Sequence, residues 1–387
     1  MSPERIEKMG GWALIGSAGA IQFSIAAGQI LLAVALACWL TAIVLQRDPI
    51  TVPRMFWPLL VYAGLTIVSA AFSPDPRTSL TDCKQLVLLL IVPMTYRLLT
   101  GSRAQALVTV VVTAGALSAA YGIIQYAILH YDSLGQRPQG TLGHYMTYSG
   151  LLMLVIGAAL ARILFGRTER TWAALVMPAL VVAVALTFSR NAWVGACAAA
   201  ALLFSLKDLR LLAVLPVVAA IFFGLAPSRV SARFNSIFDL NDPSNRDRLA
   251  MMREGTHMIA DHPLLGVGPN MVERVYLQYR VPEAEDRINP HLHNVPLQIA
   301  AERGLPALAA WLAFIVILCV DLARAFFAGA QRFLAAAGLA SVVAMIGAGL
   351  FEYNFGDSEF LMLFLLLATL PFAAARHVAG HRDRWQT

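Results

Sequence analysis

Charged residues are scarce in this sequence. Of its 387 residues, 13% are Asp, Glu, Lys or Arg and 58% are hydrophobic, whereas soluble domains are about a quarter charged and about half apolar. Apolar runs close to the roughly 20 residues that cross a hydrocarbon core recur along the whole chain. A signal peptide would supply only one such run, near the start. The composition therefore excludes a soluble protein and predicts an integral membrane protein.

Cysteine is also scarce, and patterns typical of metal sites are missing. The four cysteines are scattered with no paired spacing, so neither a disulfide framework nor a cysteine metal site follows: Cys38, Cys83, Cys197 and Cys319. The sequence has no Asp-x-Asp pair, and we recognise no His/Glu spacing typical of metal ligands. We expect no metal and no cofactor, so any bound anion must be held by arginines.

Basic residues, in contrast, follow a regular pattern. The formal net charge is +6, but basic loops beside membrane helices are the ordinary result of the positive-inside rule, and we expect no nucleic-acid partner. If the N-terminus is cytoplasmic, every connection on that side is basic. The residues assigned to it are Arg5, Lys8, Arg47, Arg54, Arg97, Arg103, Arg162, Arg167, Arg170, Lys207, Arg210, Arg324, Arg332, Arg376, Arg382 and Arg384.

Apolar windows bounded by charged or turn residues predict about twelve transmembrane helices. The expected fold class is therefore an all-α integral membrane protein. The windows lie near 12–26, 28–46, 55–72, 83–99, 105–129, 142–165, 171–188, 191–206, 209–225, 294–323, 332–351 and 358–375.

One connection, from Ala226 to Leu292, is much longer than the others. Some 67 residues are too many for an idle linker in a compact bundle, so we expect a folded, functional loop on the non-cytoplasmic side. Its pattern predicts a helix over 248–259, a turn-rich break at 263–269 and a short helix around 270–280. The expected organisation is helices in 1–225, a loop domain in 226–293, and helices with a cytoplasmic tail in 294–387.

His293 and Asn294 stand where the long loop meets the tenth predicted helix. Asn294 is a good N-cap with Pro296 in the first turn, which puts His293 at the positive end of a helix. The helix dipole disfavours imidazolium there and leaves a neutral ring that can accept a proton, as a general base must. The alternative is an interfacial histidine that only caps the helix or binds the loop.

Arg190 lies at the predicted start of the eighth helix, at the outer membrane surface. A guanidinium beside the free N–H groups of a helix N-terminus suits phosphate or diphosphate. An arginine that extends to the membrane interface is the alternative. Arg246 and Arg248, just before the helical pattern of the long loop, could provide a second anion ligand, although a solvated loop arginine is the alternative for each.

Polar residues elsewhere on the same side are further candidates. Glu352, Asp357 and Glu359, between the last two predicted helices, could orient a sugar or a basic partner, or could simply form a polar cap. Weaker candidates precede the sixth predicted helix: Arg137, His144 and Tyr145.

Four segments, in this order, resemble the signature of the O-antigen ligase and polymerase superfamily. They are Ser189–Trp193, Arg248 followed by Pro263–Gly268, His293-Asn294 followed after nine residues by Gly304, and Phe351–Asn354 with Asp357–Glu359. The resemblance covers the chain from about Arg137 to Glu359, together with the number of helices. One departure is Ala307, where the family often has Gly, Thr or Tyr.

Within this superfamily the sequence is most similar to the lipopolysaccharide O-antigen ligases. The resemblance implies a GT-C-like enzyme, with about twelve transmembrane helices and one long, partly helical periplasmic loop, in the bacterial inner membrane. It implies polysaccharide transfer from undecaprenyl diphosphate to a sugar hydroxyl of lipid A-core, within membrane lipid. The implied mechanism is inverting and metal-independent, with His293 as base and Arg190 and Arg248 on the diphosphate. Substrate binding is assigned to Arg137, Arg246, His291, Asn294, Glu352 and Asp357.

Three other functions remain open from the sequence. An O-antigen polymerase and a protein O-oligosaccharyltransferase would use the same residues with another acceptor. A polyprenyl-linked sugar transporter is less well supported, because few ionisable groups lie within the predicted spans and no repeated broken-helix pattern is present.

Overall fold

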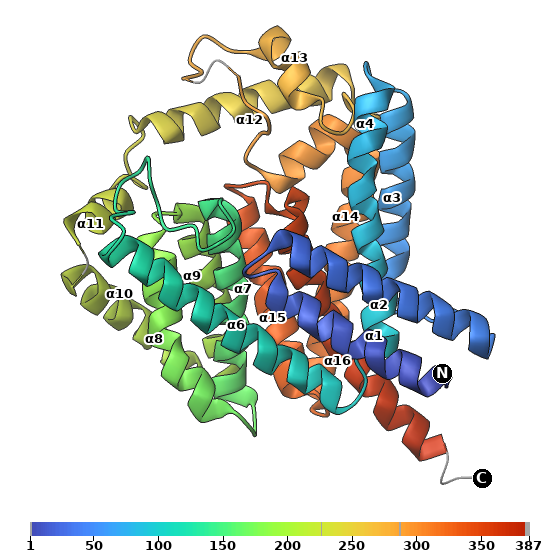
Figure 1. Ribbon diagram of the computed structural model, residues 1–387. Helices are drawn as coiled ribbons and strands as arrows, with labels where there is room; N and C mark the ends of the chain where they lie inside the picture. Colours follow the sequence, from blue (N-terminus) through green and yellow to red (C-terminus); the bar gives the residue numbers. More distant parts are fainter. Residues whose placement is uncertain (1, 226, 286–287, 384–387) are drawn as a thin grey trace.

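The computed structural model describes residues 2–225, 227–285 and 288–383, and Ala226 and Arg384 of the predicted loop and tail lie outside them. The regular elements described are helical (Figure 1). They are α1 (Pro3–Ala20), α2 (Ile25–Gln46), α3 (Phe56–Ala71), α4 (Pro76–Asp82), η1 (Cys83–Leu90), α5 (Ile91–Leu98), α6 (Ser102–Ala127), α7 (Tyr145–Phe165), α8 (Arg170–Leu186), α9 (Arg190–Lys207), η2 (Leu209–Ala213), α10 (Val214–Leu225), α11 (Ser228–Asn235), α12 (Pro243–Asp261), α13 (Val272–Tyr279), α14 (Val295–Ala328), α15 (Arg332–Gly349), η3 (Asn354–Gly356) and α16 (Ser358–Asp383).

Six of these helices are long and apolar enough to cross a membrane: α2, α6, α7, α14, α15 and α16. Three shorter apolar helices accompany them, at Phe56–Ala71, Arg170–Leu186 and Leu209–Ile221. The expectation of an all-helical multi-pass membrane protein is confirmed. Each expected window coincides with a helix or a run of two, but the count of twelve spans stays a prediction.

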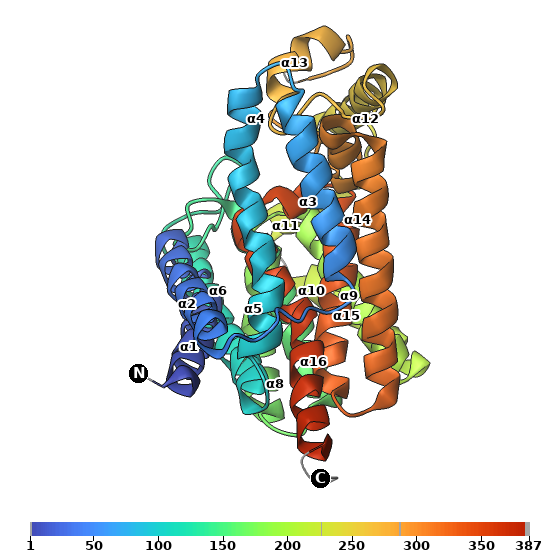
Figure 2. The ribbon, with the colours of Figure 1, turned by 90° about the vertical axis from the view of Figure 1, so that its right-hand side faces the viewer.

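The centre of the bundle is formed by α7, α15 and α16, whose apolar windows are 78%, 72% and 78% buried. By contrast, α2 is only 22% buried and lies at the outside of the bundle (Figures 1 and 2). Because both helices and lipid tails are apolar, an exposed apolar helix such as α2 is the expected outer surface of a membrane bundle. Helices α12 and α13 lie across one end, and the start of α1 and the last turns of α16 lie toward the other (Figures 1 and 2).

The long connection is folded, as expected. It contains α11, α12 and α13, and the two helices predicted at 248–259 and 270–280 correspond to the last two. A small apolar core holds this segment against the start of α14. Its buried members are Met251, Met258, Val267, Met271, Val272, Val275, Leu292 and Ala301.

The connection between the third and fourth predicted spans contains a helix that the sequence analysis did not predict, α4. Asp75 is its N-cap and accepts a hydrogen bond from the Thr78 N–H at 3.2 Å, and Pro76 occupies the first turn. Arg274 from α13 pairs with the same carboxylate. The extra helix therefore links the membrane bundle to the loop domain.

A kink in α14 explains the glycine of the third motif segment, Gly304. Gly304 has φ 81°, a left-handed value that L side chains rarely adopt. A Cβ there would lie 2.1 Å from the Leu264 carbonyl oxygen. The break frees helix carbonyls, and Gly268 N–H donates to the Glu302 carbonyl at 2.8 Å. Glycine at this position lets the turn-rich segment bind directly to the opened helix.

Candidate functional site

Most of the predicted site residues line two adjoining cavities at the α12 end of the bundle. The first, which we call the arginine cavity, has a volume of about 410 Å³ and is lined by residues that include Arg137, Arg190, Arg233, Arg248 and His293. The three residues predicted to be catalytic, Arg190, Arg248 and His293, therefore meet around one space.

The second space, which we call the histidine cavity, has a volume of about 380 Å³. Its lining includes His144, His291, His293, Glu352 and Asp357. Because His293 also lines the arginine cavity, the two spaces meet at this imidazole. The His293 ring therefore lies between the cavity that is lined by the arginines and the cavity that is lined by Glu352 and Asp357.

Local backbone structure fixes His293 in this position. Asn294 is the N-cap of α14, and its Oδ1 accepts a hydrogen bond from the Leu297 N–H at 2.9 Å, as predicted. Its Nδ2 donates to the Leu350 carbonyl at 3.1 Å, which ties α14 to the end of α15. His293 has φ 48°, a conformation disfavoured for residues with a Cβ. Asn294 thus acts as a cap and cross-link, and it does not line either cavity.

Glu352 contacts His293 directly. The His293 Nδ1 atom lies 2.9 Å from Glu352 Oε2, and the Glu352 side chain is nearly buried. Burial opposes ionisation of Glu352, but the hydrogen bond and positive potential of His293 lower its pKa to about 2. An ionised carboxylate only accepts hydrogen bonds, so Nδ1 must carry the hydrogen. The other nitrogen, Nε2, is then the one free to accept a proton.

His291 is the third member of this group. Its ring meets the His293 ring edge-on with centroids 4.2 Å apart, and its Nε2 lies 3.8 Å from Glu352 Oε1. Burial, and then repulsion by His293, lower the pKa of His291 to about 4. His291 therefore stays neutral near pH 7 and adds no charge beside the candidate base.

These three side chains form a group that the sequence patterns did not reveal. Ligand atoms of His291, His293 and Glu352 all lie within 4.8 Å of one another, so they could hold a divalent ion. A local His/Glu spacing could not reveal this group, because its carboxylate comes from a turn 59 residues after His293. The expectation of a metal-free mechanism stays a prediction.

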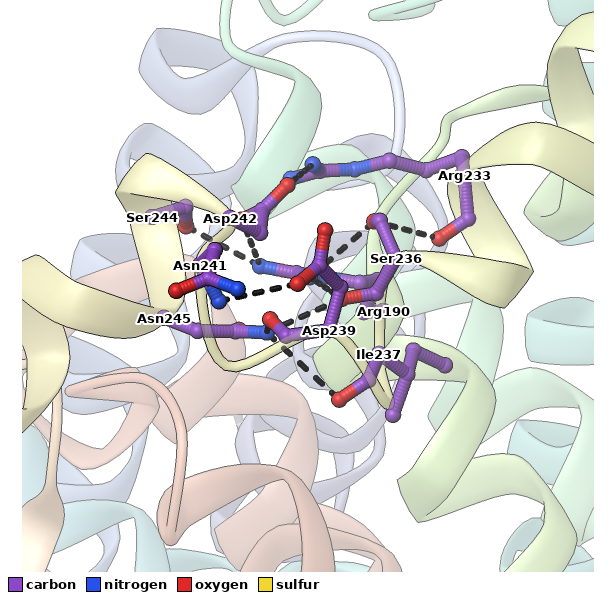
Figure 3. A network of polar contacts seen from close by, with 9 residues as sticks. All are labelled: Arg190, Arg233, Ser236, Ile237, Asp239, Asn241, Asp242, Ser244 and Asn245. Carbon is purple, nitrogen blue, oxygen red and sulfur yellow. Dashed lines mark hydrogen bonds and ion pairs between the residues drawn. The ribbon is translucent and has the colours of Figure 1, made fainter.

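Arg190 is bound by the long loop (Figure 3). Its Nη1 donates to the Ser236 carbonyl at 3.0 Å and its Nη2 to the Ser244 hydroxyl at 3.0 Å, while Asp242 lies 3.5 Å from Nη2. With 6% of its surface exposed, Arg190 is not a solvated interfacial arginine. Arg190 begins α9, as predicted, and its hydrogen bonds join the long loop to this helix.

Asp242 also pairs with an arginine that the sequence analysis missed. Arg233, on α11, lies 3.6 Å from Asp242 and lines the arginine cavity. One carboxylate thus bridges two of the four arginines there. No motif indicated Arg233, because its position depends on how α11 folds back toward α9.

The remaining cationic candidates occupy different positions. Arg248 lines the arginine cavity, and burial lowers its pKa while the nearby Glu352 opposes this change. Arg137 lies with its guanidinium 4.2 Å from the centroid of the Tyr145 ring and lines the same cavity. Arg246 lies outside both sets of lining residues and pairs with Glu285 at 3.1 Å.

Asp357 is largely occupied by structural contacts. Its Oδ1 accepts hydrogen bonds from the Glu359 and Phe360 N–H groups, both at 3.0 Å, and its Oδ2 accepts one from Thr147. These contacts correspond to the polar-cap alternative for this turn. Asp357 still lines the histidine cavity, where it lies among the candidate substrate ligands.

Comparison with known proteins finds a family similarity for the part of the chain that contains most of the candidate site. A search of curated proteins finds no match. Residues 175–312 match the sequence profile of the family described as O-antigen ligase. The matched range includes Arg190, Arg248, His293 and Gly304, whereas Glu352 lies beyond it. Over residues 175–312, the chain is therefore similar to the O-antigen ligase family.

Proposed function

We propose that this glycosyltransferase is an O-antigen ligase of the bacterial inner membrane, with its site facing the periplasm and both termini cytoplasmic. It transfers a polysaccharide from undecaprenyl diphosphate to a sugar hydroxyl of lipid A-core. The observation that carries the proposal is the meeting of Arg190, Arg248 and His293 around one cavity. A reaction between two lipid-anchored substrates needs such a base and such cations at the membrane surface.

The arginine cavity suits the diphosphate of the donor. Four guanidiniums line it, and Asp242 and Glu285 are among the carboxylates that partly offset their charge. Guanidinium binds phosphate oxygens through two parallel hydrogen bonds, so two or more arginines can take the charge of the leaving group without a metal. Because the loop already fixes Arg190, little reorganisation is needed when the donor binds.

The histidine cavity suits the acceptor sugar. Its lining includes the carboxylates of Glu352 and Asp357 and the imidazoles of His144, His291 and His293. His293 also lines the arginine cavity. Carboxylates and imidazoles accept hydrogen bonds from sugar hydroxyls. An acceptor bound here would present its hydroxyl at His293, on the side away from the arginines.

The proposed reaction is a single displacement. His293 Nε2 removes the proton from the acceptor hydroxyl, and the oxygen attacks the anomeric carbon of the donor sugar. The bond between that carbon and the diphosphate oxygen breaks, and undecaprenyl diphosphate leaves with the electron pair. Arg190 and Arg248 stabilise the growing negative charge, and Glu352 stabilises the imidazolium. One displacement inverts the anomeric configuration.

The test is transfer by the purified full chain in detergent, with undecaprenyl-diphosphate-linked polysaccharide and lipid A-core supplied together. We expect the polysaccharide to become attached to the core with inverted configuration at the new bond, measured by mass spectrometry and NMR. Chain lengthening without attachment to the core would identify a polymerase, and attachment to an added acceptor protein a protein-glycosylating enzyme. No transfer without a sealed compartment would favour a transporter.

A further inference from the structure

A second group of cations lies at the other end of the bundle from α12 and α13. It surrounds a pocket of about 820 Å³ between the ends of α7, α8 and α9 and the turn from α14 to α15. We call this the basic pocket and define it by Arg167, Arg170, Lys207, Arg332 and Phe165, which are among its lining residues. Its size lies within the range of small-molecule sites, about 300–1,000 Å³.

The four cations of the basic pocket are not paired with carboxylates in the part of the chain that the structure describes. No Asp or Glu lines the pocket, and none of the four forms an ion pair with any residue that the structure describes. The neighbouring carboxylate of Asp208 accepts a hydrogen bond from the Arg210 N–H instead. Four like charges around one space repel one another, and an anion between them would relieve this repulsion.

Aromatic rings hold two of these cations in place. The Arg332 guanidinium lies 4.6 Å from the centroid of the Phe326 ring and 5.5 Å from that of Phe165, and the Lys207 Nζ lies 5.7 Å from the Phe165 ring centroid. Contact with a ring face orients a guanidinium but leaves its in-plane N–H groups available. The pocket therefore offers oriented donors of the kind that bind phosphate oxygens.

Apolar surface adjoins the pocket. Phe327, two residues before the lining Gly329, is 75% exposed, and Leu175 on α8 is 71% exposed. We propose that the basic pocket binds the phosphate headgroup of an anionic phospholipid, whose acyl chains lie along α8 and α14. A cationic pocket between membrane helices beside apolar surface has the chemistry of such a lipid site, whereas a soluble phosphate would gain nothing from that surface.

The test measures lipid binding by the purified full chain in neutral detergent. Phosphatidylglycerol with a fluorescent acyl chain is the probe, and phosphatidylglycerol, phosphatidylcholine and inorganic phosphate are the competitors. We expect unlabelled phosphatidylglycerol to displace the probe and the other two to leave it bound at the same concentration. Equal competition by phosphatidylcholine, or full displacement by inorganic phosphate, would overturn the proposal.

A charge-matched pair of variants locates the site. Arg167→Gln with Arg332→Gln should weaken probe binding about 30-fold, because each basic group near a membrane surface contributes about fivefold. The control removes Arg5 and Arg47, exposed cations at the same end, as Arg5→Gln with Arg47→Gln. Equal weakening in both variants would show nonspecific attraction and refute the site. Thermal unfolding without lipid establishes that both variants are folded.

Discussion

The arginines at the two ends of the molecule are held in different ways. At the α12 end, Arg190 is buried and binds Ser236, Ser244 and Asp242. At the other end, Arg332 is exposed, rests on aromatic rings and has no carboxylate partner in the described chain. The difference matches the two proposed roles: a preorganised group suits a reaction that depends on geometry, whereas binding an anionic headgroup requires mainly positive charge.

Removal of the candidate base should cause the largest loss of activity at the α12 end. His293→Ala should lower the transfer rate about a hundred- to ten-thousand-fold, because it removes the positioned group that is proposed to accept the hydroxyl proton. The rate of polysaccharide attachment to lipid A-core by purified protein measures this. Wild-type activity in a normally folded His293→Ala protein would refute the role of the imidazole.

Replacing Arg190 by lysine tests whether the arginine cavity depends on the fixed geometry of this guanidinium. Arg190→Lys keeps the charge but loses the planar fork that contacts Ser236 and Ser244, so we expect transfer to fall about a hundredfold or more. Arg253→Lys, at an exposed pair with Glu283 on the same side, is the matched control and should keep its activity. Full activity of Arg190→Lys would mean that charge alone suffices.

Neutralising the carboxylate beside the base should have a smaller effect. Glu352→Gln can still accept the Nδ1 hydrogen but no longer stabilises imidazolium, so we expect roughly a ten- to hundredfold slower transfer. For the same reason the acid limb of the pH–rate profile should move to lower pH. With pKa values of about 4 and about 2, His291 and Glu352 cannot themselves cause a limb between pH 5 and 8. An unchanged limb would contradict the pairing.

Chelation tests whether the three-ligand group needs an ion. His291, His293 and Glu352 could hold one, yet the four guanidiniums of the arginine cavity already supply positive charge for the leaving group. We expect EDTA treatment followed by desalting to change transfer less than about twofold. Loss of activity that is restored by one added divalent metal would replace the proposed base mechanism with a metal-assisted one.

The basic pocket should contribute least to chemistry. The double variant Arg167→Gln with Arg332→Gln should transfer polysaccharide at nearly the wild-type rate in neutral detergent, because it leaves the arginine cavity intact. The same assay used for His293→Ala measures this. A loss as large as that of Arg190→Lys would show that the two ends are coupled and would remove the contrast between them.

The sequence predicted those parts of the site that depend on local patterns. Hydropathy located the membrane helices, and Asn294 with Pro296 correctly predicted the start of α14. The capping signal at Asp75 and Pro76 was equally strong and would have revealed α4. The contact of Glu352 with His293 and the place of Arg233 were beyond such patterns, since each depends on how segments far apart in the chain pack together.

The kink at Gly304 lies among contacts that join segments far apart in the chain. The opened helix and the turn-rich segment are joined to α3 by Ser69, whose hydroxyl donates to the Leu265 and Glu302 carbonyls at 2.6 and 2.9 Å. The residues joined by these two hydrogen bonds are 196 and 233 positions apart in the chain. The carboxylate that contacts His293 belongs to Glu352, in the turn before the final helix. A partly synthesised chain thus contains the arginines and His293 before it contains Glu352, so the proposed pairing of base and carboxylate forms only once the last part of the chain is made.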